Sequence, residues 1–273
     1  MMENPHDHAF ERPHDFAVEL VDATKTFGTG DGAVRALRGV TLTVPQQQKT
    51  VLLGLSGSGK STTLRLINRL HDATTGKVRV LGQDVMRLSP RELRAFRRQT
   101  AFVFQHFNLV GRLSALENVL SGGLGSLRAP RSGIMMYPNR MRVAALDQLD
   151  RVGLADQAFQ RSGTLSGGQQ QRVGIARALF QQPKLVLADE PVASLDPESS
   201  RQVMEILQQV CDEDGLTVIC SLHQIELAID WADRVIGLRD GQVVLDRSSQ
   251  GMVPSDASGI YSADVSTDPM SES

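Results

Sequence analysis

The chain has 273 residues, of which 41% are hydrophobic and 22% are charged, a composition typical of a globular protein with a substantial core. Its formal net charge of −2 argues against a nucleic-acid-binding protein, because such proteins usually carry a basic excess. Aromatic residues make up only 4% of the chain, so a broad surface for stacking bases is not expected.

Residues 1–15 form a polar segment that we expect to be a disordered tail. Its histidines, His6, His8 and His14, could bind a metal, but a loose polar tail needs no metal to explain them. No apolar stretch follows a basic start, so the segment is not a secretory signal. No apolar run in the chain reaches the ~20 residues that span a bilayer. We therefore expect a cytoplasmic protein that reaches a membrane only through a partner.

From residue 16 onward, short apolar runs alternate with amphipathic segments, which predicts an α/β core. The first core helix starts near Lys60 and places Leu64, Ile67 and Leu70 on one face. Further core helices are predicted at residues 170–180 and 198–210. The predicted strands are residues 16–20, 40–44, 50–54, 78–81, 100–104, 184–188, 217–221 and 234–238, and residues 241–245 complete a hairpin.

Helical signals dominate residues 89–161, which predicts a mostly helical arm inserted in this core. Pro90 stands at the first position of one helix, and Ser114 starts a capping box at the beginning of another. Residues 121–139 are rich in Gly, Ser and Pro and are expected to be a flexible loop. Helical periodicity then returns at residues 141–152.

The end of the chain, residues 248–273, is rich in Ser and Asp and has too few apolar residues for a further domain. We expect it to be a disordered tail. The two cysteines, Cys211 and Cys220, have no CxxC spacing and no histidine pair nearby. Reduced structural thiols are therefore favoured over a metal or redox site.

A phosphate-binding loop is indicated at residues 54–61, which fit the pattern GxxxxGK[ST] between an apolar strand and a helix. Its glycines let consecutive backbone N–H groups face phosphate oxygens, and the helix N-terminus adds partial positive charge. Lys60 would bind the β- and γ-phosphates and Ser61 would bind Mg²⁺, whereas a glycine turn without nucleotide is the alternative. The predicted nucleotide-binding residues here are Gly54, Leu55, Ser56, Gly57, Ser58, Gly59, Lys60, Ser61 and Thr62.

The apolar strand at residues 184–188 ends in two acids, Asp189 and Glu190. Asp189 is placed to hold the Mg²⁺ shell. Glu190 is expected to be the general base that polarises the attacking water. Paired acids at a strand end are often only solvated, but the phosphate-binding loop upstream favours the catalytic interpretation.

The pentapeptide at residues 165–169 precedes an amphipathic helix and therefore forms a second helix N-terminus suited to phosphate. It resembles the signature of the ATP-binding cassette (ABC) ATPases. The resemblance implies a head-to-tail dimer with a second copy of the chain. In it, ATP lies between the phosphate-binding loop (P-loop) of one copy and the signature of the other copy. It also implies that residues 193–196 run across that interface. The residues implied to serve the nucleotide of the other copy are Ser166, Gly167, Gly168, Gln169 and Asp196.

The resemblance implies roles for residues that the sequence alone leaves open. Gln105 matches a glutamine that contacts Mg²⁺ and water, although a lone glutamine is a surface residue by default. His223 matches the switch histidine that contacts the γ-phosphate and helps to hold Glu190 and the water; taken alone it would be a structural histidine. Phe27 matches an aromatic that stacks on adenine, and it could equally belong to the core.

The resemblance covers residues 16–247 and implies a P-loop NTPase core with a mixed sheet, an antiparallel β subdomain and an inserted helical subdomain at about 89–161. A narrower likeness is to the phosphonate-import ATPases, although polar amino-acid importers share residues 104–109 closely. It rests on residues 104–110, 112–114, 116–120, 165–172, 187–198 and 221–224. It implies ATP and Mg²⁺ as ligands, permease subunits and, indirectly, a substrate-binding protein as partners, and a place on the cytoplasmic face of the inner membrane.

Other functions stay open because the cargo of such a complex does not contact the ATPase. The same enzyme could serve a polar amino-acid importer, an exporter or a lipoprotein-release complex. A non-transport ABC protein acting on ribosomes or DNA usually has two cassettes or a long coiled-coil insertion, and this sequence shows neither, nor a basic surplus. The leading hypothesis is an ATPase subunit whose ATP-driven dimer closure powers an importer for phosphonate or a phosphite-like oxyanion.

Overall fold

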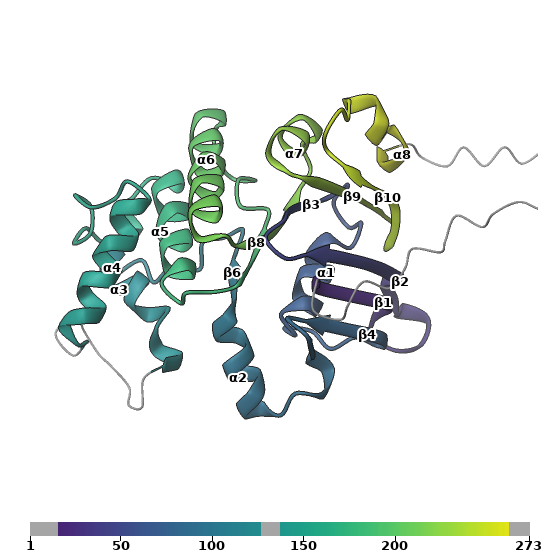
Figure 1. Cartoon of the computed structure of the whole chain (residues 1–273), viewed down its shortest axis with the longest axis horizontal. Helices are drawn as coiled ribbons and strands as arrows, with labels where there is room; N and C mark the ends of the chain where they lie inside the picture. Colours follow the sequence, from purple (N-terminus) through teal and green to yellow (C-terminus); the bar gives the residue numbers. More distant parts are fainter. Residues whose placement is uncertain (1–15, 127–136, 262–273) are drawn as a thin grey trace, which may run out of the picture.

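The computed structural model describes residues 16–126 and 137–261. The predictions for residues 1–15, for the middle of the loop at 121–139 and for residues 262–273 fall outside the described residues. Figure 1 shows two sheets on the right and in the centre, with a group of helices on the left. Within the described residues no helix has both the length and the apolar character needed to cross a membrane.

The core is a six-stranded mixed sheet with the order β10-β9-β3-β8-β7-β6. Strands β3, β6, β7, β8 and β9 pair in parallel, and β10 closes the edge as an antiparallel hairpin with β9. Buried parallel strands require apolar residues on both faces, and every residue of β7 and β8 is buried. The bounds are β3 Lys49–Leu53, β6 Thr100–Val103, β7 Leu185–Asp189, β8 Thr217–Leu222, β9 Arg234–Arg239 and β10 Gln242–Ser248.

Alternate residues of these strands enter two separate hydrophobic cores, as the two-residue period of a strand requires. In β7, Val186 and Ala188 pack with the helical arm and with the helices that follow β7 and β8. Leu185 and Leu187 face the opposite core, which contains the first helix and the antiparallel sheet. The mixed sheet therefore separates the two halves of the molecule and presents its strand ends between them.

The second sheet is antiparallel and has the order β2-β1-β4-β5. Helix α1, Lys60–Ile67, shares one core with this sheet and with the mixed sheet. The prediction of an α/β fold with a mixed sheet and an antiparallel β subdomain is confirmed. The bounds are β1 Phe16–Phe27, β2 Val34–Pro45, β4 Thr75–Val80 and β5 Gln83–Asp84, with short 3₁₀ turns at Gly30–Gly32 and Val85–Arg87.

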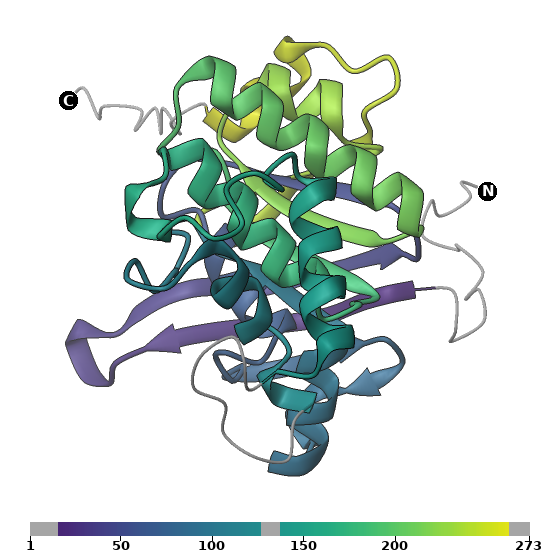
Figure 2. The ribbon, with the colours of Figure 1, turned by 90° about the vertical axis from the view of Figure 1, so that its left-hand side faces the viewer.

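Helices α3 and α4 of the helical arm pack with α5 on the face opposite α1, and Figure 2 shows these helices and α6 in front of the strands. Capping boxes at Ser89 and Ser114 start α2 and α3, as the sequence predicts for Ser114. The strand predicted at residues 100–104 is confirmed as β6, which lies within residues 89–161 and pairs with β7 of the mixed sheet. The bounds are α2 Pro90–Gln99, α3 Ala115–Ser121, α4 Asn139–Arg151, α5 Gly167–Leu179, α6 Pro197–Asp214 and α7 Ile225–Trp231, with 3₁₀ turns at Leu124–Ser126 and Ser162–Thr164.

The two cysteines are free thiols inside the protein, Cys211 on α6 and Cys220 on β8. Burial raises the pKa of Cys211 to about 12 and raises the pKa of Cys220 as well. Because the thiolate is the reactive form of cysteine, both are inert structural residues at neutral pH.

Residues 248–261 are part of the folded structure, so the prediction of a disordered tail from residue 248 is wrong for these residues. A 3₁₀ turn at Pro254–Ala257 leads into the short helix α8, Ser258–Tyr261. Met252, Ala257 and Ile260 are buried, and α8 lies beside β9 and β10 in Figure 1. Apolar residues are few in this segment, but Met252, Ala257 and Ile260 are spaced so that all three reach the core.

Replacing Ile260 with serine tests this docking, because Ile260 is 1% exposed. We expect Ile260→Ser to lower the free energy of unfolding by at least about 2 kcal/mol, through a cavity and a buried hydroxyl. Val253→Ser is the matched control, since Val253 belongs to the same segment and is 51% exposed; its effect should stay within about 0.5 kcal/mol. Urea unfolding measures both, and equal midpoints for the two variants would contradict the docked segment.

Candidate functional site

The residues predicted to bind phosphate and Mg²⁺ and to catalyse hydrolysis lie at the carboxyl ends of four neighbouring parallel strands, β3, β8, β7 and β6. Residues 54–61 follow β3 and His223 follows β8. Asp189 ends β7, Glu190 comes directly after it, and Gln105 follows β6. Open α/β sheets bind ligands just outside the carboxyl ends of their strands. The fold therefore brings residues from distant parts of the sequence together at the carboxyl ends of these strands.

The phosphate-binding loop is wrapped around the side chain of Lys60, which is only 3% exposed. Its Nζ donates to the backbone oxygens of Gly54 at 2.8 Å and Leu55 at 3.0 Å. Gly57 and Gly59 have φ angles of +83° and +105°, which glycine adopts without strain. The loop thus has the backbone conformation that turns successive N–H groups toward an anion.

Gly59 is also required by the close approach of strand β2. A Cβ atom at this position would lie 2.7 Å from Cδ2 of Leu37 and 3.0 Å from the backbone oxygen of Ala36. The antiparallel sheet is therefore seated directly on the phosphate-binding loop. A larger residue at position 59 would push the two sheets apart.

The carboxylate of Asp189 is the centre of a hydrogen-bond network at the end of β7. Oδ1 accepts from Oγ of Ser61 at 2.7 Å and from Oγ of Ser221 at 3.0 Å. Oδ2 accepts from the guanidinium of Arg65 at 3.3 Å. Ser61 and Arg65 are four residues apart and so share a face of α1. The sequence analysis identified Ser61 and Asp189 but missed Ser221 and Arg65.

Glu190 lies next to the phosphate-binding lysine, with Oε1 at 3.4 Å from Nζ of Lys60. Its backbone N–H donates to Oγ of Ser221 at 2.9 Å. Its φ of +46° is in the left-handed region, which is unfavourable for glutamate. Such strain clusters at functional sites and persists only where the surroundings hold the residue in place. Ser221 is part of that support, because its hydroxyl accepts from Glu190 and donates to Asp189.

Gln105 and His223 occupy the neighbouring strand ends, but in the described part of the chain neither side chain is hydrogen-bonded to Asp189 or Glu190. The loop that carries Gln105 is held by Arg177 of α5, which donates to the backbone oxygens of Phe107 at 2.8 Å and Asn108 at 2.6 Å. Arg177 was also missed, because its bonds go to backbone atoms about 70 residues away. The catalytic roles of Gln105 and His223 remain predictions.

Phe27 ends β1 on the antiparallel sheet and is 37% exposed. His71 packs against its ring edge-on at a centroid distance of 5.2 Å, and Nζ of Lys25 lies 4.9 Å from the ring centre. Burial, and then the charges of Arg65 and Lys25, lower the pKa of His71. Phe27 is therefore a surface aromatic and not a core residue, and its stacking on adenine remains a prediction.

The pentapeptide at residues 165–169 begins helix α5. Ser166 is exposed and forms a capping box with Gln169, in which each side chain binds the backbone N–H of the other residue, at 2.9 and 3.3 Å. A Cβ at Gly168 would lie 3.0 Å from the side chain of Ser199, so the glycine lets the start of α6 pack against α5.

Asp196 caps α6 by accepting from the backbone N–H of Ser199 at 3.0 Å, and this hydrogen bonding lowers the pKa of Asp196. The N-termini of α5 and α6 therefore lie together at an exposed surface, each with a capped first turn. The contacts of Ser166, Gly167, Gly168, Gln169 and Asp196 with a second nucleotide remain predictions.

The sequence profile of the ABC transporter family matches residues 37–193, which include the phosphate-binding loop, the signature and both acids of β7. The chain belongs to the ABC transporter family. It is an ABC-type ATPase that binds ATP, as the resemblance in the sequence predicts. Cassettes of this family form dimers and work with membrane permeases.

Similar proteins support this assignment. The phosphate-import ATP-binding protein PhnC of Mycolicibacterium smegmatis is 58% identical over 247 residues, which cover 90% of this chain and 92% of that protein. The phosphonates import ATP-binding protein PhnC of Nocardia farcinica is 58% identical over 238 residues, 87% of each chain. A dimeric cassette in a post-hydrolysis state, bound to ADP and Pi, superposes with a TM-score of 0.76 at 38% identity, covering 86% of this chain and all 100% of that one.

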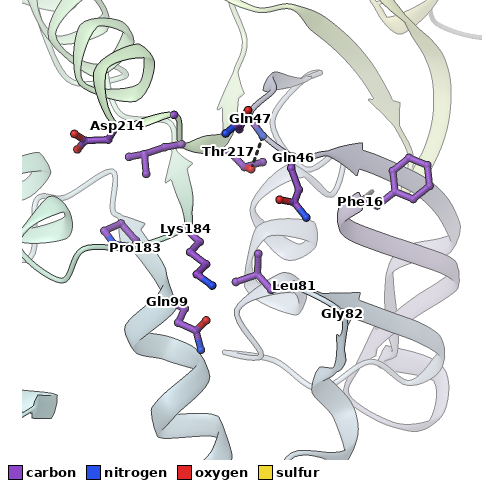
Figure 3. A pocket seen from close by; sticks show the side chains of 12 residues that line it. Phe16, Gln46, Gln47, Leu81, Gly82, Gln99, Pro183, Lys184, Asp214 and Thr217 are labelled. Carbon is purple, nitrogen blue, oxygen red and sulfur yellow. Dashed lines mark hydrogen bonds between the residues drawn. The ribbon is translucent and has the colours of Figure 1, made fainter. Parts of the chain in front are cut away.

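A separate pocket of about 410 Å³ lies at the opposite ends of the strands of the mixed sheet, their amino ends. Figure 3 shows Gln99, Lys184 and Thr217 around it, at the amino ends of β6, β7 and β8. It contains none of the predicted site residues. The phosphate-binding loop, and not this cavity, is therefore the candidate nucleotide site.

The bridging hydroxyl of Ser221 gives a direct test of the network around Asp189. We expect Ser221→Ala to lower the ATPase rate at least about ten-fold, because Glu190 loses the hydroxyl that accepts from its backbone and Asp189 loses a donor. Thr217→Val is the matched control: its hydroxyl accepts from the backbone of Gln47 at 2.9 Å, at the other end of the same strand. Steady-state ATP hydrolysis should fall far more in Ser221→Ala than in Thr217→Val, while both variants lose stability. Equal rates in the two variants would contradict the network.

Proposed function

We propose that this ABC ATPase powers an importer for phosphonate or a related phosphorus oxyanion. The supporting observation is the 58% identity, over nearly the whole chain, to proteins whose names specify phosphate import and phosphonates import. The two names differ in the exact cargo and share its chemistry. We further propose that the protein sits on the cytoplasmic face of the inner membrane, bound to permease subunits that receive cargo from a substrate-binding protein.

The geometry around α1 fits ATP with Mg²⁺. Ser61 and Asp189 present a hydroxyl and a carboxylate whose oxygens are 2.7 Å apart, and hard oxygen ligands are what Mg²⁺ prefers. Mg²⁺ keeps several waters and phosphate oxygens in its shell, so a large cluster of protein acids is not required. Gln105 would add an amide oxygen from the loop after β6. When bound, the cation would neutralise charge that develops on the phosphates.

Hydrolysis needs a base beside the γ-phosphate, and we assign this role to Glu190. Lys60 is the residue that binds the β- and γ-phosphates, and its Nζ lies 3.4 Å from Oε1 of Glu190. A water held by Glu190 would transfer a proton to this carboxylate as its oxygen attacks phosphorus in line with the departing ADP. His223, from the neighbouring strand end, would hold the γ-phosphate and the water. Phosphate and ADP are the products.

The signature completes this site in a second copy of the chain. Ser166 is exposed, and the N-terminus of α5 carries the partial positive charge that attracts phosphate. We propose that ATP bound to the P-loop of one copy is closed from the opposite side by residues 166–169 of the other, with Asp196 in the interface loop. ATP binding would then close a head-to-tail dimer, and hydrolysis would reopen it.

This chain has a groove between the helical arm and the core that is suitable for docking of the permease. A cavity of about 580 Å³ is lined by Gly122, Met141, Ala144 and Phe180, with Arg98 at the end of α2. Its lining combines apolar side chains with two arginines, Arg98 and Arg140, and with glutamines, a mixture that fits a short amphipathic segment of a membrane subunit. Arg177, whose backbone lies against Gly122, also holds the Gln105 loop. Movement of a docked segment would therefore be transmitted through α5 to the loop that carries Gln105.

Glu190→Gln tests the base. We expect at least about a hundred-fold loss of steady ATP hydrolysis, because the amide cannot accept the proton of the attacking water. ATP-dependent dimerisation should persist, since the P-loop and signature are unchanged; light scattering with ATP measures it. Glu205→Gln is the control, as Glu205 is exposed on α6. Hydrolysis by Glu190→Gln at the parent rate would show that another residue is the base.

The cargo is tested by purifying this ATPase with its permease and its binding protein. Mass spectrometry of the binding protein should identify a phosphonate, phosphite or phosphate as the ligand. In proteoliposomes that ligand should stimulate ATP hydrolysis, whereas a polar amino acid should not. Stimulation by an amino acid and not by a phosphorus oxyanion would overturn the proposed cargo and leave the ATPase assignment intact.

A further inference from the structure

The C-terminal segment, residues 249–261, reaches the loop that carries His223. The phenolic hydroxyl of Tyr261 donates to the backbone oxygen of His223 at 2.9 Å. Tyr261 is the last residue of α8 and lies 38 positions from His223 in the sequence. A segment outside the nucleotide-binding motifs thus contacts the backbone of a predicted catalytic residue.

The position of Tyr261 is fixed by the residues before it. The side chain of Ile260 fills the space over Gly237 of β9, where a Cβ would lie 2.5 Å from Cδ1 of Ile260. The guanidinium of Arg239 donates to the backbone oxygen of Gly259 at 2.8 Å. Further back, Arg247 and Asp256 form an ion pair at 3.0 Å. The tyrosine therefore extends from an anchored segment and not from a loose end.

The corner at His223, in contrast, has little packing of its own. β8 ends at Leu222 and α7 begins at Ile225, and Gln224 precedes the helix without a side-chain cap. Both His223 and Gln224 are exposed. A cavity of about 740 Å³ opens beside them, bounded by Leu195 and Pro197 at the start of α6 and by Tyr261 on the other side. Residues 223–224 thus face a cavity on the side of α6, and on the side of α8 they are held by the hydrogen bond from Tyr261.

We propose that Tyr261 is a positioning residue for His223: its hydrogen bond sets the backbone of this corner so that the imidazole meets the γ-phosphate. This inference rests on the proposed role of His223 in hydrolysis. Burial raises the pKa of Tyr261, so the phenol is protonated and remains a donor at neutral pH. Because the bond goes to a backbone oxygen, it constrains the loop and leaves both imidazole nitrogens available to the phosphate and the water.

The experiment replaces Tyr261 with phenylalanine in the full chain. Tyr261→Phe retains the ring and its packing and removes only the donor. We expect the ATPase kcat to fall about three- to ten-fold, the effect of one hydrogen bond, with KM for ATP unchanged. Tyr137→Phe is the matched control, since Tyr137 is buried in the helical arm and the chain has two tyrosines. It should leave kcat unchanged.

Two further measurements separate positioning from a purely structural role. In a His223→Ala background, where there is no imidazole to position, Tyr261→Phe should cause no additional loss in single-turnover hydrolysis. Amide hydrogen exchange of residues 223–225 should become faster in Tyr261→Phe, whereas exchange of residues 54–61 should not change.

The outcomes distinguish the inference from the function on which it rests. If His223→Ala hydrolyses ATP at the parent rate, the role proposed for His223 fails and the inference fails with it. If His223→Ala is slow while Tyr261→Phe has the parent kcat, only the inference is overturned. An equal loss from Tyr261→Phe with and without His223 would also overturn it, because the tyrosine would then act elsewhere.

Discussion

The hydrogen-bonded carboxylate of Asp189 holds the candidate catalytic site together. It is buried, and a buried carboxylate is stable only when donors satisfy it. Those donors come from the helix after the P-loop and from the neighbouring strand: Ser61 at 2.7 Å, Arg65 at 3.3 Å and Ser221 at 3.0 Å. The same bonds fix the ends of β7 and β8 against α1. The position of Glu190, one residue further, follows from this network.

The two cores explain why the site stays at the boundary between two halves of the molecule. Each buried strand sends alternate residues to opposite cores, and Gly59 lets β2 of the antiparallel sheet rest on the phosphate-binding loop. On the other side, Arg177 ties α5 to the loop after β6, and Gly168 lets α6 rest on the start of α5. Signature, Gln105 loop and interface loop are therefore mechanically connected within one chain, which suits an enzyme that converts ATP binding into movement of a partner.

Much of this could be predicted from sequence because the signals are local. The glycine pattern before Lys60, the apolar run before Asp189 and the capping box at Ser114 each lie within a few residues, and the loop before a helix, the strand and the cap that they predict are confirmed. Ser221 could not be found in this way, since its hydroxyl acts on Asp189 across 32 positions. The structured C-terminal segment was missed because its few buried apolar residues, Met252, Ala257 and Ile260, pack on parts of the fold that are distant in the sequence, as Ile260 does over Gly237. Strand β6 was predicted at residues 100–104, but its pairing with β7 was not, because strand pairing is invisible to local periodicity.

The central claim is that one ATP is held by the strand ends of one copy and by the signature of another. An experimental structure of the Glu190→Gln variant with ATP and Mg²⁺ tests it most directly. The account predicts a head-to-tail dimer in which the triphosphate lies over Lys60, the cation lies between Ser61 and Asp189, and Ser166 of the partner subunit binds the γ-phosphate. A nucleotide bound to a single copy with residues 165–169 left in solvent, or bound away from the P-loop, would contradict it.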